Sequence, residues 1–297
     1  MSDHAPIPRD VLGCIVAGYE KGGTTLVKDL LRTTGQMRSA FEGGLLFAEQ
    51  PADGVPEPYA GQLLQSWELP GDFFDRYRAC ASFAEGYRLL RELSFIRRKE
   101  LPLIDKTPRY MACLADVLRR APGTPVVVVL RDPLQVAGSW VRLGNSVADA
   151  AEAIRVSTAG LVAAPEEALA AVYVIQLADV VADPAGVCVR LQAWLGREHV
   201  PYDATHQLGT SPPGAPPPLG VDAARVEVGR HVSPEEVTRL EAELTALVPW
   251  AGLVATVPSG PLIDKLPDAR SLWAAVVADE AARRASSGGD PTPETTV

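Results

Sequence analysis

The segment Val11-Leu-Gly-Cys-Ile-Val-Ala-Gly-Tyr-Glu-Lys-Gly-Gly-Thr-Thr25 decides the fold class of this 297-residue chain. Its first eight residues form an apolar run without helical periodicity, which is typical of a strand buried on both faces of a parallel sheet. Two glycines then lead into Thr24–Thr33, where Leu26, Leu30 and Leu31 lie on one stripe of an expected helix. A strand that turns through glycines into a helix directs backbone N–H groups and the positive end of the helix dipole at one point. That geometry binds phosphate.

Further apolar runs alternate with helical segments along the chain. This alternation predicts an α/β fold: a P-loop-like three-layer domain with a central parallel sheet flanked by helices. The apolar runs are expected strands at Val126–Leu130 and Ala171–Leu177. The helical segments are an expected helix through Val136, Trp140 and Leu143 and another from about Pro184 to Leu195.

The remaining segments suggest one domain with an insertion. Residues 43–75 are irregular and rich in glycine, proline and aromatic residues, so they predict a substrate-side insertion or lid, within an insertion of about 43–100. The small, polar tail at 286–297 is expected to be disordered. We therefore expect a single domain over residues 1–285.

Composition excludes several classes of protein. The chain is 47% hydrophobic and 22% charged, which excludes a disordered or fibrous chain. Its 28 Lys and Arg against 37 Asp and Glu give a net charge of −9, which argues against a nucleic-acid partner because neutralising phosphates requires surplus basic residues. An anionic small ligand remains compatible, since the local field of a pocket can oppose the net charge.

Cysteine and histidine usage bears on metal binding and location. The four cysteines are far apart without a CxxC motif, and no two of the four histidines have helical ligand spacing, so no metal site is expected. The N-terminus lacks the basic and apolar regions of a signal peptide, and the longest apolar run near the middle is too short to span a bilayer. A cytoplasmic protein without a membrane span is therefore expected.

The glycine-rich turn differs from the loop of nucleotide-hydrolysing enzymes. That loop reads GxxxxGK[ST], and its lysine reaches the β- and γ-phosphates. Gly18 and Gly23 have the required spacing, but Thr24 stands at the lysine position and the loop's lysine is Lys21. This departure weakens the interpretation as a kinase or ATPase, and a purely structural turn stays open as an alternative.

The turn resembles the first loop of sulfotransferases that use 3′-phosphoadenosine-5′-phosphosulfate (PAPS), which reads approximately [KR]-[ST]-G-T-T-x-[LW]. Lys21-Gly-Gly-Thr-Thr-Leu26 matches apart from glycine at the serine position. The resemblance implies that Lys21 contacts the 5′-phosphosulfate. The residues that would enclose that group are Gly22, Gly23, Thr24 and Thr25.

A second anchor follows the valine-rich strand. Arg131 and Ser139 are eight residues apart, as in the sulfotransferase pattern for the 3′-phosphate. An arginine at the carboxyl end of a strand offers a charged fork, and a hydroxyl two helical turns later can add a hydrogen bond to the same dianion. The alternative is that Arg131 pairs with a helix carboxylate while Ser139 only faces the sheet.

Sulfuryl transfer to an alcohol or phenol requires a base for the hydroxyl proton. In many bacterial and tyrosylprotein-like sulfotransferases this base is a glutamate twenty-one residues after the loop's basic residue and four after an arginine. Glu42 has that spacing from Lys21 and Arg38. An exposed loop carboxylate is the alternative interpretation of Glu42, and Glu49 is the nearest rival for the role of base.

Three further cations complete the candidate site. Asp105-Lys-Thr-Pro-Arg-Tyr110 resembles the family's [DE]-K-[ST]-P-x-[YH] segment, and the residue before a proline is kept out of helix, so Lys106 is expected to be extended and to point at the sulfuryl oxygens or at the base. A solvated surface lysine is the alternative. Arg109 is assigned to the acceptor, and the resemblance places Arg230 in a loop over the 3′-phosphate.

These observations predict a PAPS-dependent sulfotransferase that releases adenosine 3′,5′-bisphosphate without a metal. Glu42, Lys21 and Lys106 are its expected catalytic residues. The aromatic residues of 43–75 favour a small-molecule hydroxyl or phenol acceptor. The alternatives are a P-loop kinase-like phosphotransferase, which the absent GK[ST] opposes, and a catalytically inactive nucleotide-binding protein, which Glu42 and Lys106 oppose.

Overall fold

The apolar run at the start of the chain forms β1 (Leu12–Gly18), and every residue of this strand is buried. It lies inside a five-stranded sheet of order β2-β1-β3-β4-β5. Its neighbours β2 (Leu103–Lys106) and β3 (Val126–Leu130) are parallel to it, and β4 (Val172–Gln176) is parallel to β3. The edge strand β5 (Gly260–Pro261) pairs antiparallel with β4.

This architecture comes from a computed structural model that describes residues 4–205, 259–261, 274 and 278. The expected tail at 286–297 and the candidate residue Arg230 lie outside the described residues. Among the described helices, none combines the length and the apolar character needed to cross a membrane.

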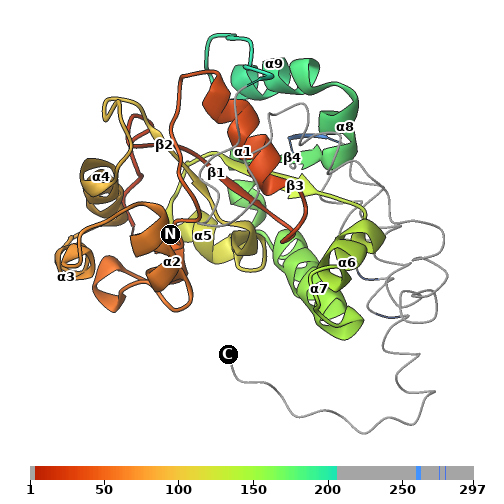
Figure 1. Cartoon of the computed structure of the whole chain (residues 1–297), viewed down its shortest axis with the longest axis horizontal. Coiled ribbons are helices and arrows are strands. Elements are labelled where there is room, and N and C mark those ends of the chain that lie inside the picture. Colours follow the sequence, from red (N-terminus) through yellow and green to blue (C-terminus); the bar gives the residue numbers. More distant parts are fainter. Residues whose placement is uncertain (1–3, 206–258, 262–273, 275–277, 279–297) are drawn as a thin grey trace, which may run out of the picture.

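Helices cover both faces of the sheet, which gives three layers (Figure 1). The valine run of β3 serves both faces: Val126 and Val128 belong to one apolar core, and Val127 and Val129 belong to the other. The second core is closed by α1 (Thr24–Thr33), α8 (Leu177–Ala182) and α9 (Pro184–Trp194). The first is closed by α5 (Leu114–Arg120), α6 (Pro133–Val141) and α7 (Val147–Val162).

The predicted α/β class is therefore confirmed, with small differences at the ends of elements. The helix at 24–33 and the strand at 126–130 have the expected bounds. β4 is one residue shorter at each end than expected, and α9 ends one residue earlier. Leu143 lies beyond α6, which ends at Val141.

The expectation of an irregular stretch at 43–75 was wrong. Two helices lie there, α2 (Tyr59–Ser66) and α3 (Phe73–Arg78), followed by α4 (Phe83–Leu93). Tyr59 and Leu63 in α2, like Phe73 and Tyr77 in α3, are buried residues four apart, which a helix places on one face. The helices are short and flanked by proline and glycine, so their periodicity was hidden. Figure 1 shows all three on the side of the sheet where β2 lies.

The sheet order marks where a ligand can bind. The chain leaves β1 for β2 on one side, and it later returns to β3 on the other side of β1. In open parallel sheets of this kind, ligands bind outside the carboxyl ends of the strands at the point where the strand order reverses. That point lies between Gly18 and Val129, which are register partners at the end of β1 and within β3.

Candidate active site

The residues between β1 and α1, 19–23, form a tight turn that we call the glycine loop. The Gly22 amide donates to the Tyr19 carbonyl at 2.8 Å, and Lys21 and Gly23 both have a positive φ, 64° and 91°. Gly23 is the N-cap of α1 and contributes no side-chain cap. The first N–H groups of the helix therefore stay available for an anion.

Two glycines of this loop are required by close contacts. A Cβ at Gly23 would lie 2.5 Å from Leu177 Cδ1, and a Cβ at Gly22 would lie 2.7 Å from the Tyr19 carbonyl oxygen. The family's serine would not fit at position 22 unless the turn shifted. Glycine at position 22 therefore fits the observed backbone, in which its amide donates to the Tyr19 carbonyl oxygen.

The second predicted anchor contacts the glycine loop directly. Arg131, 6% exposed, donates from Nη1 to the Lys21 carbonyl oxygen at 2.8 Å and to Ser139 Oγ at 3.2 Å. Burial, and then the neighbouring Arg142, lower the pKa of the Arg131 guanidinium from its ordinary value. The two segments therefore meet in space, and no carboxylate among the described residues pairs with Arg131 within ion-pair distance.

Two contributors near this anchor were not recognised in the sequence. Arg142 Nη2 donates to Ser139 Oγ at 3.1 Å, so a second guanidinium reaches the same hydroxyl. Trp140 Nε1 donates to the Glu20 carbonyl oxygen at 3.2 Å. The spacing offered a signal for Arg142, because it lies three residues after Ser139 and hence on the same helical face.

Glu42 and Lys106 form an ion pair at the carboxyl end of β2. Lys106 Nζ lies 2.8 Å from Glu42 Oε1, and the side chains are 2% and 14% exposed. The ammonium also lies 4.5 Å from the ring centroid of Phe41. Lys106 is therefore not a solvated surface lysine, and of the two targets expected for it, it contacts the carboxylate. Thr107 is extended, as the following proline predicts.

A buried lysine of α1 reaches the chain just before Glu42. Lys28 Nζ donates to the Ala40 carbonyl oxygen at 3.2 Å and lies 3.2 Å from Asp29 Oδ1. Burial lowers the pKa of Lys28 to about 8; Asp29 opposes this shift, whereas Lys106 and Arg32 add to it. The sequence pattern of the helix gave no indication of this contact, because a lysine on α1 is ordinarily solvent-facing.

Arg109 pairs with a residue of the glycine loop and is an electrostatic neighbour of Glu42. Its Nε lies 3.1 Å from Glu20 Oε1, and the side chain is 52% exposed. Tyr59 of α2 is an electrostatic neighbour of Arg109, Glu20 and Glu42, and burial, followed by Glu42, raises the pKa of its phenol. Through Tyr59, which the sequence analysis did not single out, α2 also contributes to the surroundings of Glu42 and Arg109.

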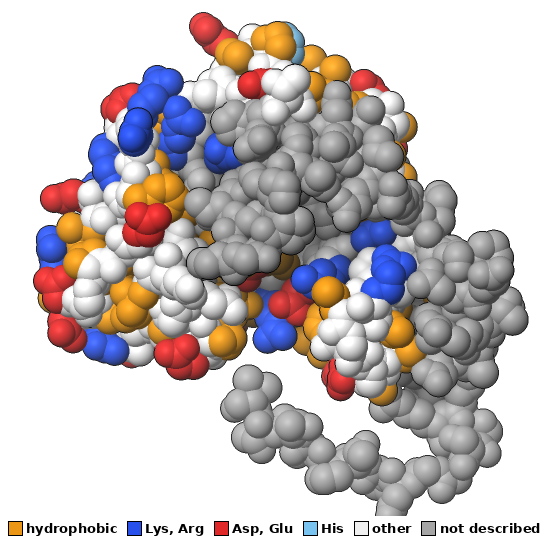
Figure 2. All heavy atoms as spheres, viewed as in Figure 1, with side chains coloured by type: hydrophobic (Ala, Val, Ile, Leu, Met, Phe, Trp, Pro, Cys, Tyr) orange, Lys and Arg blue, Asp and Glu red, His pale blue; other side chains and the backbone are white. Residues whose placement is uncertain are grey.

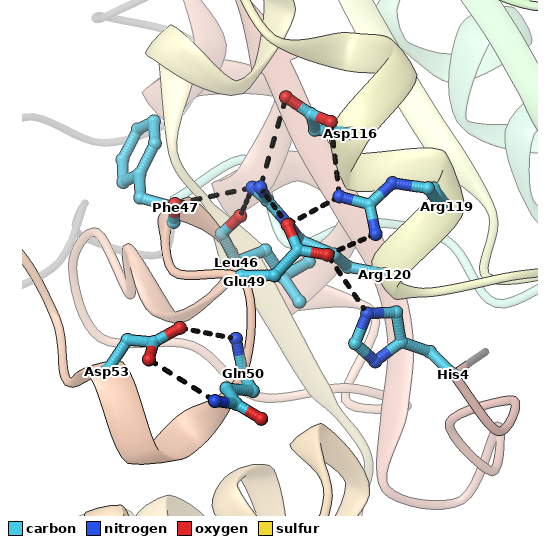
Figure 3. Close-up of polar contacts among 9 residues, drawn as sticks. All are labelled: His4, Leu46, Phe47, Glu49, Gln50, Asp53, Asp116, Arg119 and Arg120. Carbon is cyan, nitrogen blue, oxygen red and sulfur yellow. Dashed lines mark hydrogen bonds and ion pairs between the residues drawn. The ribbon is translucent and has the colours of Figure 1, made fainter. Parts of the chain in front are cut away.

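Glu49, the rival for the role of base, is held elsewhere (Figure 3). Hydrogen bonds from Arg119 and Arg120 lower the pKa of its carboxyl well below the ordinary value. These arginines lie at the end of α5, which leads into the beginning of β3. They are therefore on the side of the amino ends of the strands, whereas Lys106 lies at the carboxyl end of β2. A carboxylate held as the anion by two guanidinium groups is a poor proton acceptor.

The surface around the second anchor is basic. Figure 2 shows Lys and Arg side chains gathered over α6, despite the acidic balance of the whole chain. Within residues 4–205 and 259–261, no group of three His, Cys, Asp or Glu side chains is arranged to hold a metal ion. Lys21 and Thr25 are exposed at the mouth of the glycine loop, whereas Thr24 is buried.

Comparison with known proteins gives a consistent result. A family model described as "Sulfotransferase family" matches residues 14–201. Among solved structures, the sulfotransferase domain of the olefin synthase from Synechococcus PCC 7002 is 18% identical with a TM-score of 0.57, covering 82% of this chain and 96% of that domain. The sulfotransferase domain from the curacin biosynthetic pathway is 16% identical with a TM-score of 0.51, covering 82% and 99%. At these identities the likeness concerns the fold. No curated protein sequence matches the chain.

Proposed function

Because the chain belongs to the sulfotransferase family, we propose that it transfers the sulfuryl group of PAPS to a hydroxyl or phenol group of a small-molecule acceptor. The observation that supports this most is the arrangement of two polar clusters at the carboxyl ends of adjacent strands. Lys21 and Arg131 meet between β1 and β3, and Glu42 and Lys106 meet at the end of β2.

The residues of the first cluster fit a ligand with two phosphate-type groups. The exposed Lys21 ammonium and the uncapped start of α1 are suited to the 5′-phosphosulfate. Arg131, Ser139 and the neighbouring Arg142 are suited to the 3′-phosphate, since guanidinium forks bind such dianions. When bound, PAPS would supply a sulfuryl group attached to a phosphate leaving group.

The second cluster supplies the proton chemistry. Glu42 would accept the proton of the acceptor hydroxyl as the hydroxyl oxygen bonds to sulfur. The bond from sulfur to the phosphate oxygen of PAPS would break in the same step, releasing adenosine 3′,5′-bisphosphate. Lys106 holds this carboxylate in place, and its positive charge also favours the negative charge that develops on the sulfuryl oxygens. Arg109 and Tyr59, on the acceptor side of Glu42, orient the acceptor. The ring of Phe41, 37% exposed, gives that side an apolar surface.

The test uses the purified full chain. Thermal unfolding is measured with adenosine 3′,5′-bisphosphate, with ATP and magnesium, and without ligand, because a ligand specific for the native state raises the melting temperature. The chain is then incubated with PAPS and a panel of phenols and alcohols, and products heavier by the mass of SO₃ are sought. Stabilisation by the bisphosphate and sulfated products support the proposal. ATP turnover would favour a kinase, and binding without transfer an inactive protein.

A further inference from the structure

The backbone of the segment 42–46, the Glu42 loop, is bound by side chains from distant parts of the chain. The Gly43 amide donates to Asp105 Oδ1 at 3.2 Å and to Thr107 Oγ1 at 3.1 Å, and the Gly44 amide donates to Thr107 Oγ1 at 3.2 Å. The Leu46 amide donates to Tyr110 Oη at 2.9 Å. Every one of these acceptors lies on β2 or directly after it.

The inserted helices bind the carbonyl groups of the same loop. Trp67, at the end of α2, donates from Nε1 to the Glu42 carbonyl oxygen at 3.3 Å. Tyr77 of α3 donates from its hydroxyl to the Leu45 carbonyl oxygen at 3.3 Å. Both aromatic side chains are buried. The inserted helices therefore hold the chain that carries Glu42, which is a different task from covering it as a lid.

Asp105 is the centre of this network. Its carboxylate is 1% exposed and accepts from Tyr87 Oη at 2.5 Å, Tyr110 Oη at 3.1 Å and Thr107 Oγ1 at 2.7 Å, in addition to the Gly43 amide. No cation among the described residues forms an ion pair with it. Burial of an unpaired carboxylate is costly, so these four donors are what retain it. The four donors come from α4, from Thr107 directly after β2, from the short helix Pro108–Met111 and from the Glu42 loop.

Asp105 and Lys106 hold the loop from two sides. Successive residues of a strand point to opposite faces of a sheet, so neighbours on β2 project in opposite directions. Asp105 contacts the Gly43 amide, and Lys106 contacts the Glu42 carboxylate. The approach is close, since a Cβ at Gly43 would lie 2.8 Å from both carboxylate oxygens of Asp105.

We propose that Asp105 is a positioning residue for the transfer reaction: through the Gly43 amide it fixes the Glu42 carboxylate against Lys106. This inference rests on the proposed function of Glu42 as the base. It assigns to the insertion at 43–100 the role of holding the Glu42 loop, directly through Trp67 and Tyr77 and through the bond from Tyr87 to Asp105. Misplacing a reacting group by about 1 Å can lower a rate by roughly a hundredfold.

The test variant is Asp105→Asn in the full chain. An asparagine can keep one oxygen toward Gly43 and Thr107, but its NH₂ group cannot accept from the tyrosine hydroxyls, so the network is disrupted without a change in size. We expect kcat to fall about 10- to 100-fold while the Kd for adenosine 3′,5′-bisphosphate stays within about twofold. Hydrogen exchange of the amides in residues 42–46 should become faster, with exchange in the glycine loop unchanged.

Two further variants separate positioning from general stability. Gln192→Leu removes buried hydrogen bonds between α9 and Val200 in the other apolar core, and it should lower the melting temperature with kcat retained. Gly43→Ala disturbs the same contact from the loop side. Its effect on kcat should not add to that of Asp105→Asn, because both act through one hydrogen bond.

The outcomes decide the inference whether or not the proposed function holds. A kcat within about threefold of wild type in Asp105→Asn, or unchanged exchange in residues 42–46, overturns it. So does a loss of kcat that Gln192→Leu reproduces at an equal melting temperature. If the wild-type chain transfers no sulfuryl group, the proposed function fails. The exchange measurement then still decides whether Asp105 holds the loop.

Discussion

The glycine loop and the Glu42 loop differ in what binds their backbone amides. In the glycine loop, the protein binds carbonyl groups, those of Glu20 and Lys21, through Trp140 and Arg131. The amides of Lys21 and Gly23 donate to none of the described residues. In the Glu42 loop the protein's side chains bind the amides of residues 43, 44 and 46 in addition to the carbonyl groups of Glu42 and Leu45.

This difference follows from what each loop has to present. Free amides at the start of a helix attract an anion, so fixing the carbonyl groups keeps the amides directed outward. A loop that works through one side chain needs its amides bound as well, because free amides beside a carboxylate would compete for it. The glycine loop is thus shaped to bind with its backbone, and the Glu42 loop to hold a side chain in place.

The largest effect is expected for Glu42→Gln, which removes the proton acceptor and keeps the shape. We expect kcat to fall at least about a hundredfold, since general base catalysis contributes about that much. The Kd for adenosine 3′,5′-bisphosphate, measured by calorimetry, should stay close to wild type. Turnover within about threefold of wild type would show that Glu42 is not the base, and the contrast between the two loops would lose its functional meaning.

A somewhat smaller effect is expected for Arg131→Ala, which acts on the glycine loop. Hydrogen bonds to charged groups contribute about 1.5–3 kcal/mol, so the bisphosphate should bind about 10- to 100-fold more weakly. Arg155→Ala, on the exposed surface of α7, serves as the matched control and should leave this affinity unchanged. Equal affinities of the two variants would show that residue 131 does not contribute to anion binding.

Lys28→Met tests the contact between α1 and the chain before Glu42 through the pH dependence of stability. The pKa of Lys28 is lowered to about 8, so above pH 8 the folded chain has released this proton while the unfolded chain still binds it. Wild-type stability should therefore rise relative to Lys28→Met, by about 1–2 kcal/mol between pH 8 and pH 9.5. Urea unfolding at these two pH values measures the difference. An equal difference at both values would contradict the buried ammonium.

The smallest effect is expected for Glu49→Gln. This carboxylate is bound by Arg119 and Arg120 and not by Lys106, so it should not take part in transfer. We expect kcat within about twofold of wild type. Comparison with Glu42→Gln tests directly which of the two glutamates is the base, because both changes remove one carboxylate and keep the side-chain size.

Local sequence was sufficient where neighbours along the chain decide the structure. The helix at 24–33, the valine strand and the extended Thr107 before its proline were all predicted from short segments. Arg131 and Ser139 were paired as one phosphate anchor from the family's spacing, and in the structure the two side chains are hydrogen-bonded to each other. The short helices α2 and α3 were missed, because their stability depends on packing of Tyr59, Phe73 and Tyr77 rather than on a long periodic pattern.

Sequence alone therefore determined the parallel sheet and the turn that follows its first strand, since these depend on apolar runs and glycines; the candidate residues stay predictions that rest on the family's spacings. Only the tertiary structure decided that Lys106 contacts Glu42, that Arg131 contacts Lys21, and that Asp105 supports Gly43. Each of these contacts joins residues more than sixty positions apart in the chain. Such contacts arise from the order of strands in the sheet and from the packing of the inserted helices, which no local pattern encodes.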